Sequence, residues 1–364
     1  MTVIQSDEFW MARALTLAAR GTNTTTPNPR VGCVIVRDGK NVGEGYHIRA
    51  GTGHAEVHAL AAAGDNARGA TAYVTLEPCS HYGRTPPCAE ALIAAQVARV
   101  VCAMEDPNPQ VAGQGLARLS AAGIEVRSGV LSQDAERLNR GFLKRMRTGR
   151  PWLTLKLASS LDGATAMANG ESQWITGPEA RADVQRARAA RCAILTGVGT
   201  VQSDDPSLNV RLDGAERQPD RIILDTHLNT PATARLLSLP GKTWILHGND
   251  ADAQRQTALA DSGANLVVLP RNEAGHLDLT AVMIWLGQQA YNDVWAEPGA
   301  TLAAALLQAR LVDDLWLYQA PVLLGSATRP LFSARLESLT EGLNMELVDV
   351  RSVGRDLRLQ LVPR

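Results

Sequence analysis

Apolar and polar residues in the first part of the chain follow two periods in turn, which predicts alternating helices and strands. Ser6 can cap a helix whose apolar positions recur three or four apart until Gly21. The apolar run 31–36 predicts a buried strand, and Asp38-Gly39 predicts a hairpin to a return strand over 42–46. Further strands are expected over 71–76, 100–104 and 124–130, and helices over 87–95, 114–122 and 132–146. The alternation predicts a layered α/β domain.

A second α/β series follows a basic segment with Gly and Pro, Arg145–Pro151. We therefore expect two domains, 1–147 and 148–364, in agreement with a length of 364 residues. The segment 176–179, Thr-Gly-Pro-Glu, has the spacing of a capping box and predicts the start of a helix. Strands are expected over 152–158, 193–196, 221–225, 243–247, 265–269, 294–296 and 315–319.

One histidine, one glutamate and two cysteines form the most specific chemical pattern in the sequence. His54 offers an imidazole, and Cys79 and Cys88 offer two thiolates, all ligands that zinc prefers. Three protein ligands leave one coordination position open for water, which is the arrangement of a catalytic zinc site. Glu56 is not needed as a ligand, and a carboxylate beside such a site can carry protons. The pattern predicts a catalytic zinc centre.

The spacing of His54 and Glu56 restricts where this centre can lie. Residues two apart on a helix point to nearly opposite sides, about 200° apart. Both side chains can reach one site only beyond the N-terminus of a short helix that ends at Gly64. Cys79 follows a strand-like run, and we expect a helix N-terminus to stabilise its thiolate.

The same residues allow two non-catalytic interpretations. His54 and the two cysteines could be ordinary core residues, which is the usual role of an isolated histidine or free thiol. Alternatively, zinc could be a structural clip, which requires a fourth protein ligand such as His58 or His81. A metalloprotease is not indicated, because its glutamate directly follows the first histidine of the pair.

The composition narrows the class of protein. The net charge is −1, from 36 basic and 37 acidic residues, and only 4% of residues are aromatic, which argues against a nucleic-acid-binding enzyme. No run approaches the roughly 18 apolar residues of a membrane span, and the first residues lack a signal-peptide apolar region. Five cysteines without a framework spacing fit a reducing compartment. We expect a cytoplasmic protein in which Cys33, Cys102 and Cys192 are buried free thiols.

The pattern His-x-Glu followed by Pro-Cys and a second Cys resembles the zinc-dependent cytidine/deoxycytidylate deaminase superfamily. Eight residues separate Cys79 from Cys88, whereas the superfamily signature has two. This insertion and the segment 26–32, Thr-Pro-Asn-Pro-Arg-Val-Gly, are similar to the pyrimidine deaminases of riboflavin biosynthesis. The resemblance implies a mixed sheet with helices on both faces and one zinc ion. Asn28 is then either a ligand of the pyrimidine or its ribose or part of an Asn-Pro turn, and His47, Arg49 and Arg84 are candidates for the substrate phosphate.

Without a resemblance, the second half reads only as an α/β domain. No Gly-x-Gly-x-x-Gly follows a strand, so a Rossmann nucleotide site is not expected. The segment 297–301 leads from a strand into a small-residue helix, where backbone amides can bind phosphate or simply form a turn. The arginine run that ends at Arg191 reads as a solvated helix face, and 160–163 reads as a turn.

Several segments of the second half resemble the reductase domain that is fused to that same deaminase: 155–163, 172–176, 193–196 together with 204–206, and 297–299. With them the resemblance covers about residues 5–360. It implies a dihydrofolate-reductase-like α/β fold, NADPH as cofactor, a phosphorylated pyrimidine substrate and a homo-oligomer. These implications come from the resembling segments alone. By resemblance, NADPH would contact Ala158, Trp174, Thr200, Asp204, Thr226, Gly299, Ala300, Thr301, Leu302, Ala303, Ala304 and Ala305. The substrate would be held by Ser172, Arg188, Leu208, Arg211 and Glu297, with Lys156 and Asp162 placed to assist proton transfer.

The sequence therefore predicts a bifunctional enzyme with a zinc-dependent pyrimidine deaminase followed by an NADPH-dependent reductase. Its rivals are a nucleic-acid deaminase with an accessory domain, a non-enzymatic zinc-clip protein, and a chain in which one half has lost its activity.

Overall fold

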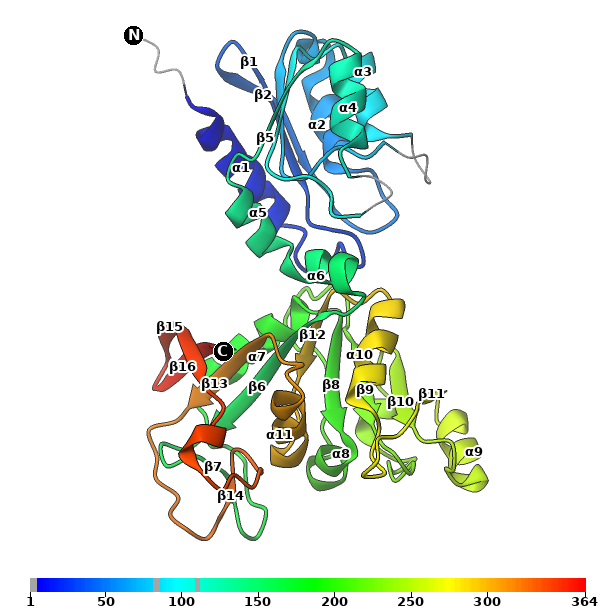
Figure 1. Cartoon of the computed structure of the whole chain (residues 1–364), viewed down its shortest axis with the longest axis vertical. Helices are drawn as coiled ribbons and strands as arrows, with labels where there is room; N and C mark the ends of the chain where they lie inside the picture. Colours follow the sequence, from blue (N-terminus) through cyan, green and yellow to red (C-terminus); the bar gives the residue numbers. More distant parts are fainter. Residues whose placement is uncertain (1–4, 81–85, 109–111) are drawn as a thin grey trace. The chain divides into compact units, whose positions relative to one another are not determined.

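The computed structural model describes residues 5–80, 86–108 and 112–364, which form two compact units, Met1–Gly149 and Arg150–Arg364. Each unit has its own sheet with helices on both faces (Figure 1). Within the described residues, no helix is long and apolar enough to cross a membrane.

The first unit is built on a five-stranded mixed sheet in the order β2-β1-β3-β4-β5. β1 pairs antiparallel with β2 and β3, whereas β3, β4 and β5 run parallel, so the mixed sheet implied by the resemblance is confirmed. The strands are β1 (Gly32–Arg37), β2 (Lys40–Tyr46), β3 (Thr71–Val74), β4 (Arg99–Cys102) and β5 (Glu125–Ser128). The helices are α1 (Asp7–Ala19), α2 (Ala55–Ala63), α3 (Cys88–Ala94), α4 (Gln114–Ala121), α5 (Ser132–Leu138) and α6 (Arg140–Thr148).

Alternation along β1 divides the first unit into two hydrophobic cores. Val34 points into a core with α1, α5 and α6, whereas Ile35 points into a core with α2, α3 and α4. On the second face, Gly43 and Gly45 of β2 let α2 approach closely: a Cβ at Gly43 would lie 2.4 Å from the Ala59 carbonyl oxygen. This close packing fixes the helix whose N-terminus carries His54.

The predicted helix over 132–146 is wrong, because the chain forms two helices that meet at Asn139. Asn139 is 2% exposed, and its side chain accepts a hydrogen bond from the Arg30 amide (2.8 Å) and donates one to the Arg30 carbonyl (2.9 Å). These bonds tie Asn139 to a distant segment and hold its backbone outside the helical region, at φ −109° and ψ 18°.

The second unit is built on a nine-stranded sheet in the order β11-β10-β9-β8-β12-β6-β13-β16-β15. The first seven are parallel and follow the predicted apolar runs: β11 (Asn265–Val268), β10 (Thr243–His247), β9 (Asp220–Leu224), β8 (Ala193–Gly197), β12 (Asp293–Ala296), β6 (Trp152–Ser159) and β13 (Asp314–Gln319). The antiparallel hairpin β15 (Met345–Val353) and β16 (Asp356–Pro363) was not predicted. A separate pair is β7 (Ala164–Met167) with β14 (Thr328–Pro330).

Five α-helices of the described residues cover the two faces of this sheet. They are α7 (Pro178–Ala189), α8 (Val198–Asp204), α9 (Ala253–Asp261), α10 (Leu279–Gln288) and α11 (Ala300–Gln308). Along β8, Leu195 packs in the core that contains α10 and α11, and Ile194 packs in the core that contains α7, α8 and α9.

The helix predicted after residue 176 forms as α7, but its capping box is wrong. The N-cap is Gly177, and no side chain of the segment caps the helix. The carboxylate of Asp356, the first residue of β16, accepts the Gly177 amide hydrogen at 2.6 Å instead. A carboxylate at a helix N-terminus compensates the unpaired amides and the helix dipole, whichever part of the chain supplies it.

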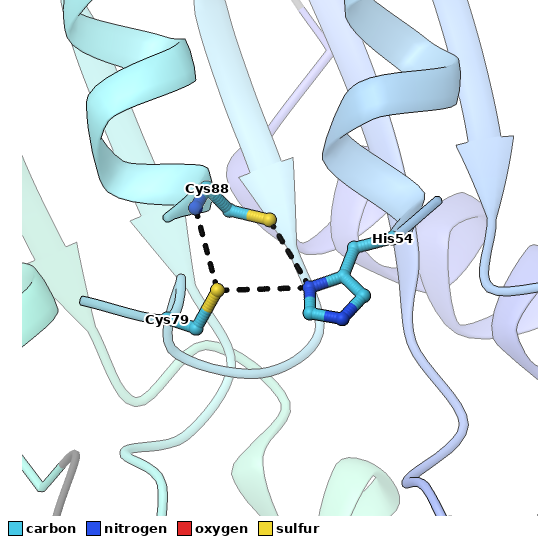
Figure 2. Close-up of side chains that lie close together, drawn as sticks. All are labelled: His54, Cys79 and Cys88. Atoms are coloured by element: carbon cyan, nitrogen blue, oxygen red, sulfur yellow. Dashed lines mark hydrogen bonds between the residues drawn. The ribbon is translucent and has the colours of Figure 1, made fainter. Parts of the chain in front are cut away.

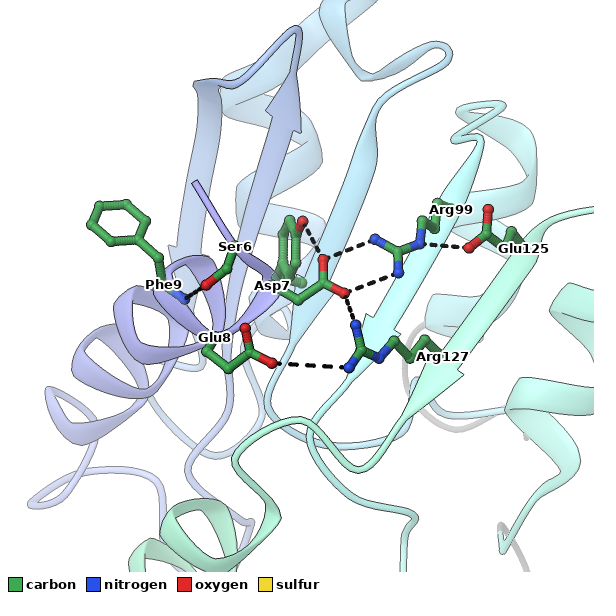
Figure 3. A network of polar contacts seen from close by, with 8 residues as sticks. Ser6, Asp7, Glu8, Phe9, Arg99, Glu125 and Arg127 are labelled. Carbon is green, nitrogen blue, oxygen red and sulfur yellow. Dashed lines mark hydrogen bonds and ion pairs between the residues drawn. The ribbon is translucent and has the colours of Figure 1, made fainter. Parts of the chain in front are cut away.

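A charged network joins the start of α1 to the far strands of the first sheet (Figure 3). The Asp7 carboxylate accepts two hydrogen bonds from Arg99 (2.8 and 2.9 Å), one from Tyr73 (2.9 Å) and one from Arg127 (2.5 Å). Its side chain is 10% exposed. These bonds, first of all those from Arg99, hold the pKa of Asp7 below its usual value.

We predict that Asp7→Asn destabilises the first unit by about 1–3 kcal/mol at pH 7, because two guanidinium groups lose a largely buried anionic partner. A carboxylate with a lowered pKa stabilises the fold above its unfolded pKa of about 4, and this contribution is lost as pH falls through the folded value. The difference between wild type and variant should therefore shrink below about pH 4. Urea denaturation of the full chain, followed by hydrogen exchange in β4 and β5, measures it.

Glu8→Gln is the matched control, because Glu8 is exposed and lies 3.9 Å from Arg127. Its midpoint should equal that of the wild type. Equal midpoints for Asp7→Asn and wild type at pH 7 would contradict the prediction.

Candidate functional site

The three predicted zinc ligands come together in the first unit at the N-termini of two helices (Figure 2). His54 is the N-cap of α2, and Cys88 is the first residue of α3. Cys79 lies in the segment after β3. The Nδ1 atom of His54 is 3.3 Å from the Cys88 sulfur and 3.6 Å from the Cys79 sulfur.

This spacing fits a zinc ion. Tetrahedral ligands at ordinary Zn–N and Zn–S bond lengths lie about 3.5 Å apart, close to both measured separations. Within the residues that the structure describes, the cluster contains these three ligands alone, and His58 lies outside it. The clip hypothesis therefore lacks a fourth ligand among the described residues. His81 and Arg84 lie outside the described residues.

The surroundings of Cys79, one of the three predicted zinc ligands, favour ionisation of its thiol. The Cys88 amide at the start of α3 donates to the Cys79 sulfur at 3.3 Å, as expected for a helix N-terminus that faces a thiolate. Hydrogen bonds from Cys88 and His54 hold the pKa of the Cys79 thiol well below its usual value, although burial opposes them. Zinc binds thiolates, so this lowered pKa favours metal binding near neutral pH.

Glu56 lies in the first turn of α2, on the same helix end as His54. The predicted geometry is thereby confirmed. Its side chain is 3% exposed, and burial raises its pKa to about 7. A carboxyl group with this pKa can both accept and donate a proton near neutral pH. Glu56 lines a cavity of about 230 Å³ together with His54 and Cys79.

Asn28 and His47 line the same cavity and are hydrogen-bonded to each other. The His47 Nδ1 atom lies 3.1 Å from the Gly53 carbonyl oxygen, which can only accept, so Nδ1 carries the proton. The Nε2 atom then accepts from the Asn28 amide nitrogen at 3.0 Å. His47 is neutral in this arrangement, and burial lowers its pKa. Arg49 is not among the residues that line the cavity.

Sequence reasoning missed four polar or aromatic residues of the cavity wall. Glu77, Asp106, Asn108 and Phe142 line it. The position of Glu77 directly before Pro78-Cys79 was a usable signal for its nearness to the metal centre. The others come from segments whose approach to the centre depends on the fold of the sheet.

The second unit has a cleft with two lobes of about 740 and 610 Å³. It lies at the carboxyl ends of β8 and β12, which is where parallel sheets bind ligands. Seven residues line both lobes: Lys156, Ala158, Thr165, Ser172, Thr200, Asp204 and Glu297.

A compensated carboxylate lies at the base of this cleft. Arg188 donates to both oxygens of Glu297, at 2.6 and 2.9 Å, and Trp295 donates to one of them at 2.8 Å. Burial opposes ionisation of Glu297, but the positive charges of Arg188 and Lys156 outweigh it and lower the pKa of Glu297 to about 2. The same burial lowers the pKa of Lys156. The solvated-face interpretation of the arginine run is wrong for Arg188 and Arg191, which are 8% and 9% exposed.

Most of the residues named for the second unit line the cleft. The larger lobe includes Trp174, Arg188, Leu208 and Arg211, and the smaller lobe includes Gly299, Ala300, Thr301 and Leu302, beside the shared Ala158, Ser172, Thr200, Asp204 and Glu297. Five named residues do not line it: Asp162, Thr226, Ala303, Ala304 and Ala305. Asp162 instead accepts hydrogen bonds from the Leu324 and Gly325 amides. Ala303 and Ala304 of α11 are buried.

Two family models match the two units separately. The cytidine and deoxycytidylate deaminase zinc-binding region matches residues 4–104, and the RibD C-terminal domain matches residues 151–359. The riboflavin biosynthesis protein RibD of Escherichia coli K12 is 54% identical, with 98% of this chain and 99% of that protein covered. The protein of the same name from Haemophilus influenzae is 48% identical, with 98% of both covered.

Solved structures agree over nearly the whole chain. Acinetobacter baumannii RibD, form 1, matches with a TM-score of 0.91 and 48% identity over 98% of this chain and 99% of that one. A Thermotoga maritima diaminohydroxyphosphoribosylaminopyrimidine deaminase/5-amino-6-(5-phosphoribosylamino)uracil reductase matches with a TM-score of 0.87 and 30% identity, over the same shares of the two chains.

Proposed function

The chain belongs to the family of the riboflavin biosynthesis protein RibD, and from this premise we propose the two reactions that its units catalyse. Residues 1–147 deaminate 2,5-diamino-6-ribosylamino-4(3H)-pyrimidinone 5′-phosphate by hydrolysis. Residues 148–364 then reduce the ribosyl side chain to ribityl with NADPH, giving 5-amino-6-ribitylamino-uracil 5′-phosphate. The observation that carries the proposal is the convergence of His54, Cys79 and Cys88 on one point beside the buried Glu56.

In the first reaction, His54, Cys79 and Cys88 would hold a zinc ion, which would supply Lewis-acid activation of the attacking water. Glu56 accepts the proton of that water and passes it to a ring nitrogen of the aminopyrimidine. It later protonates the departing ammonia, so one carboxyl group acts as base and then as acid. Its raised pKa of about 7 suits both steps.

Asn28 and His47 orient the substrate in this site. Because His47 Nε2 accepts from the amide nitrogen of Asn28, the amide oxygen of Asn28 is the group left to accept from a pyrimidine or ribose donor. The cavity of about 230 Å³ suits a single pyrimidine ring with part of its sugar, rather than a polynucleotide. The near-neutral charge of the chain supports the same choice over a nucleic-acid substrate.

In the second reaction, the cleft would hold NADPH, which would supply the hydride, and the phosphorylated intermediate. The amides at the start of α11, at Gly299 and Ala300, are suited to a cofactor phosphate. Arg188 and Arg211 are suited to the substrate phosphate as charge-assisted donors, and Glu297 fixes the Arg188 guanidinium. Lys156 is the proton carrier we assign to sugar opening, since its lowered pKa eases loss of a proton. Asp162 is no longer proposed as its partner, because it does not line the cleft.

The test is an assay of zinc-loaded protein on the pyrimidinone phosphate, first without and then with NADPH. We expect ammonia release without cofactor and NADPH oxidation after its addition. Glu56→Gln should retain zinc and reductase activity but lose at least about 100-fold in the rate of deamination, because the proton carrier is gone. A Glu56→Gln enzyme with near-wild-type ammonia release would exclude this mechanism.

We predict that Arg188→Lys raises the KM of the reductase for its phosphorylated substrate by about tenfold or more and leaves deamination unchanged. Lysine keeps the charge beside Glu297 but cannot donate in the fork geometry of a guanidinium. Steady-state kinetics of both reactions measure the effect. Arg186→Lys is the control on the same helix, because the Arg186 side chain is 61% exposed and pairs with Asp183, three residues before it. A parallel loss of both activities in Arg188→Lys would argue against separate sites.

We also propose that the protein is cytoplasmic, because its buried cysteines are free thiols, which suit a reducing compartment. We further propose that two copies of the chain associate through β15. β15 is an edge strand of the nine-stranded sheet, and its Leu347, Val348 and Val350 are 53%, 55% and 48% exposed. A long edge strand with exposed apolar side chains has unpaired backbone groups that a second β15 can satisfy by antiparallel pairing.

Val348→Lys should convert the dimer to a monomer in sedimentation velocity, because a charge on each copy would be buried in the shared edge. The control is Val268→Lys, since Val268 is 56% exposed on β11 at the opposite edge of the same sheet. A wild-type chain that sediments as a monomer at micromolar concentration would refute the proposed association.

A further inference from the structure

One buried carboxylate beside the metal centre is neither a ligand nor the proton carrier. Glu77 lies two residues before Cys79, is 3% exposed, and lines the cavity that contains Glu56. Its own amide donates to the Met104 carbonyl at 3.0 Å, which ties the end of β3 to the segment that follows β4.

Four backbone amides donate to this one carboxylate. One oxygen accepts from Asp106 (3.1 Å) and Gly113 (2.9 Å), and the other accepts from Gly115 (2.8 Å) and Leu116 (3.4 Å). An ionised carboxylate only accepts hydrogen bonds, so it can satisfy all four donors. It also supplies negative charge at the N-terminus of α4, whose N-cap Gly113 has no side chain to cap the helix.

These bonds join the segment 77–79 to another part of the cavity wall. Asp106 and Asn108 form part of that wall, and the Asp106 side chain in turn accepts from the Asn108 amide at 2.8 Å. α4 is pressed against the same segment, because a Cβ at Gly115 would lie 2.0 Å from the Pro78 carbonyl oxygen. The Glu77 carboxylate thus links the segment before Pro78-Cys79 to the backbone of Asp106, whose side chain accepts from the Asn108 amide.

We propose that Glu77 is a positioning residue of deamination that fixes the Asp106–Asn108 wall against the metal centre, at the distance that a pyrimidine ring requires. This inference rests on the proposed deaminase function. Glu77 itself does not transfer protons, since its lone pairs are directed at four amides. Its effect on the reaction passes through the placement of the substrate.

Glu77→Gln in the full chain tests the role. Glutamine has the same shape as glutamate, but its NH2 group would face two of the four backbone N–H donors. Two of the four hydrogen bonds are therefore lost. We expect about one zinc per chain, unchanged reductase kinetics, a KM of deamination raised roughly tenfold or more, and a kcat changed less than about threefold. Reductase activity in the same polypeptide reports that the chain is folded.

Glu90→Gln is the matched control, because Glu90 also binds α4, through Arg118 at 2.8 Å, but at the surface of the unit. It should leave both kinetic constants of deamination unchanged. A zinc-loaded Glu77→Gln enzyme with wild-type KM would overturn the inference, and so would parallel losses of zinc and kcat, which would make Glu77 a support of the ligand loop. Absence of ammonia release in wild type would instead overturn the deaminase function, and the inference with it.

Two further measurements separate positioning from stability. In a double-mutant cycle, Asn108→Ala should add little to the KM effect of Glu77→Gln if both act through one wall, and additive effects would overturn the inference. If Glu77→Gln does not fold, hydrogen exchange of the wild-type protein tests the positioning role instead. The amides of 106 and 113–116 should exchange several-fold more slowly when the deaminated product is added, and unchanged exchange there would overturn the inference.

Discussion

Burying a carboxylate is costly unless donors or cations face it, and three glutamates in this chain meet that constraint in three ways. Glu297 is compensated by Arg188 and Lys156, and it remains an anion well below neutral pH. Glu77 receives four backbone amides and serves as an anchor. For Glu56 the effect of burial dominates, and its pKa rises to about 7. The surroundings, rather than the residue type, decide which glutamate can exchange a proton.

The metal centre was predictable from sequence because its information is local. His54 and Glu56 are two residues apart, and only the end of a helix lets both reach one point. The same holds for Cys79 and Cys88, which are nine residues apart in the sequence, and the Cys88 amide at the start of α3 donates to the Cys79 sulfur. The buried parallel strands of both sheets, such as β4 and β8, were equally accessible, because strands buried on both faces are continuous apolar runs.

The errors have a common cause in partners that are far apart in sequence. α5 ends at Asn139 because Asn139 is hydrogen-bonded to Arg30, 109 residues away. α7 is capped by Asp356, which is 179 residues from Gly177. No local sequence pattern encodes contacts over such separations. Arg188 looked like part of a solvated helix face until Glu297 was seen opposite it, 109 residues away. The roles in the cleft came from a family resemblance, because no local motif there specifies a chemistry. Five named residues that do not line the cleft show how coarse such a transfer is at single positions.

Helix N-termini recur at several of the places where this chain has functional side chains. α2 begins at His54, α3 presents the Cys88 amide to a thiolate, α4 receives Glu77, and α11 opens the smaller lobe of the cleft at Gly299. Each supplies unpaired amides and partial positive charge without a cationic side chain, so a near-neutral chain can still hold thiolates and phosphates. The helices that do this are seven to nine residues long and rich in alanine. Isolated helices of that length are marginal in water, so their N-termini are held in place by packing on the sheet. The close approach of α2 to Gly43 and of the Pro78 carbonyl to Gly115 therefore matters for function, because it fixes the positions of α2 and α4 and of their N-terminal amides.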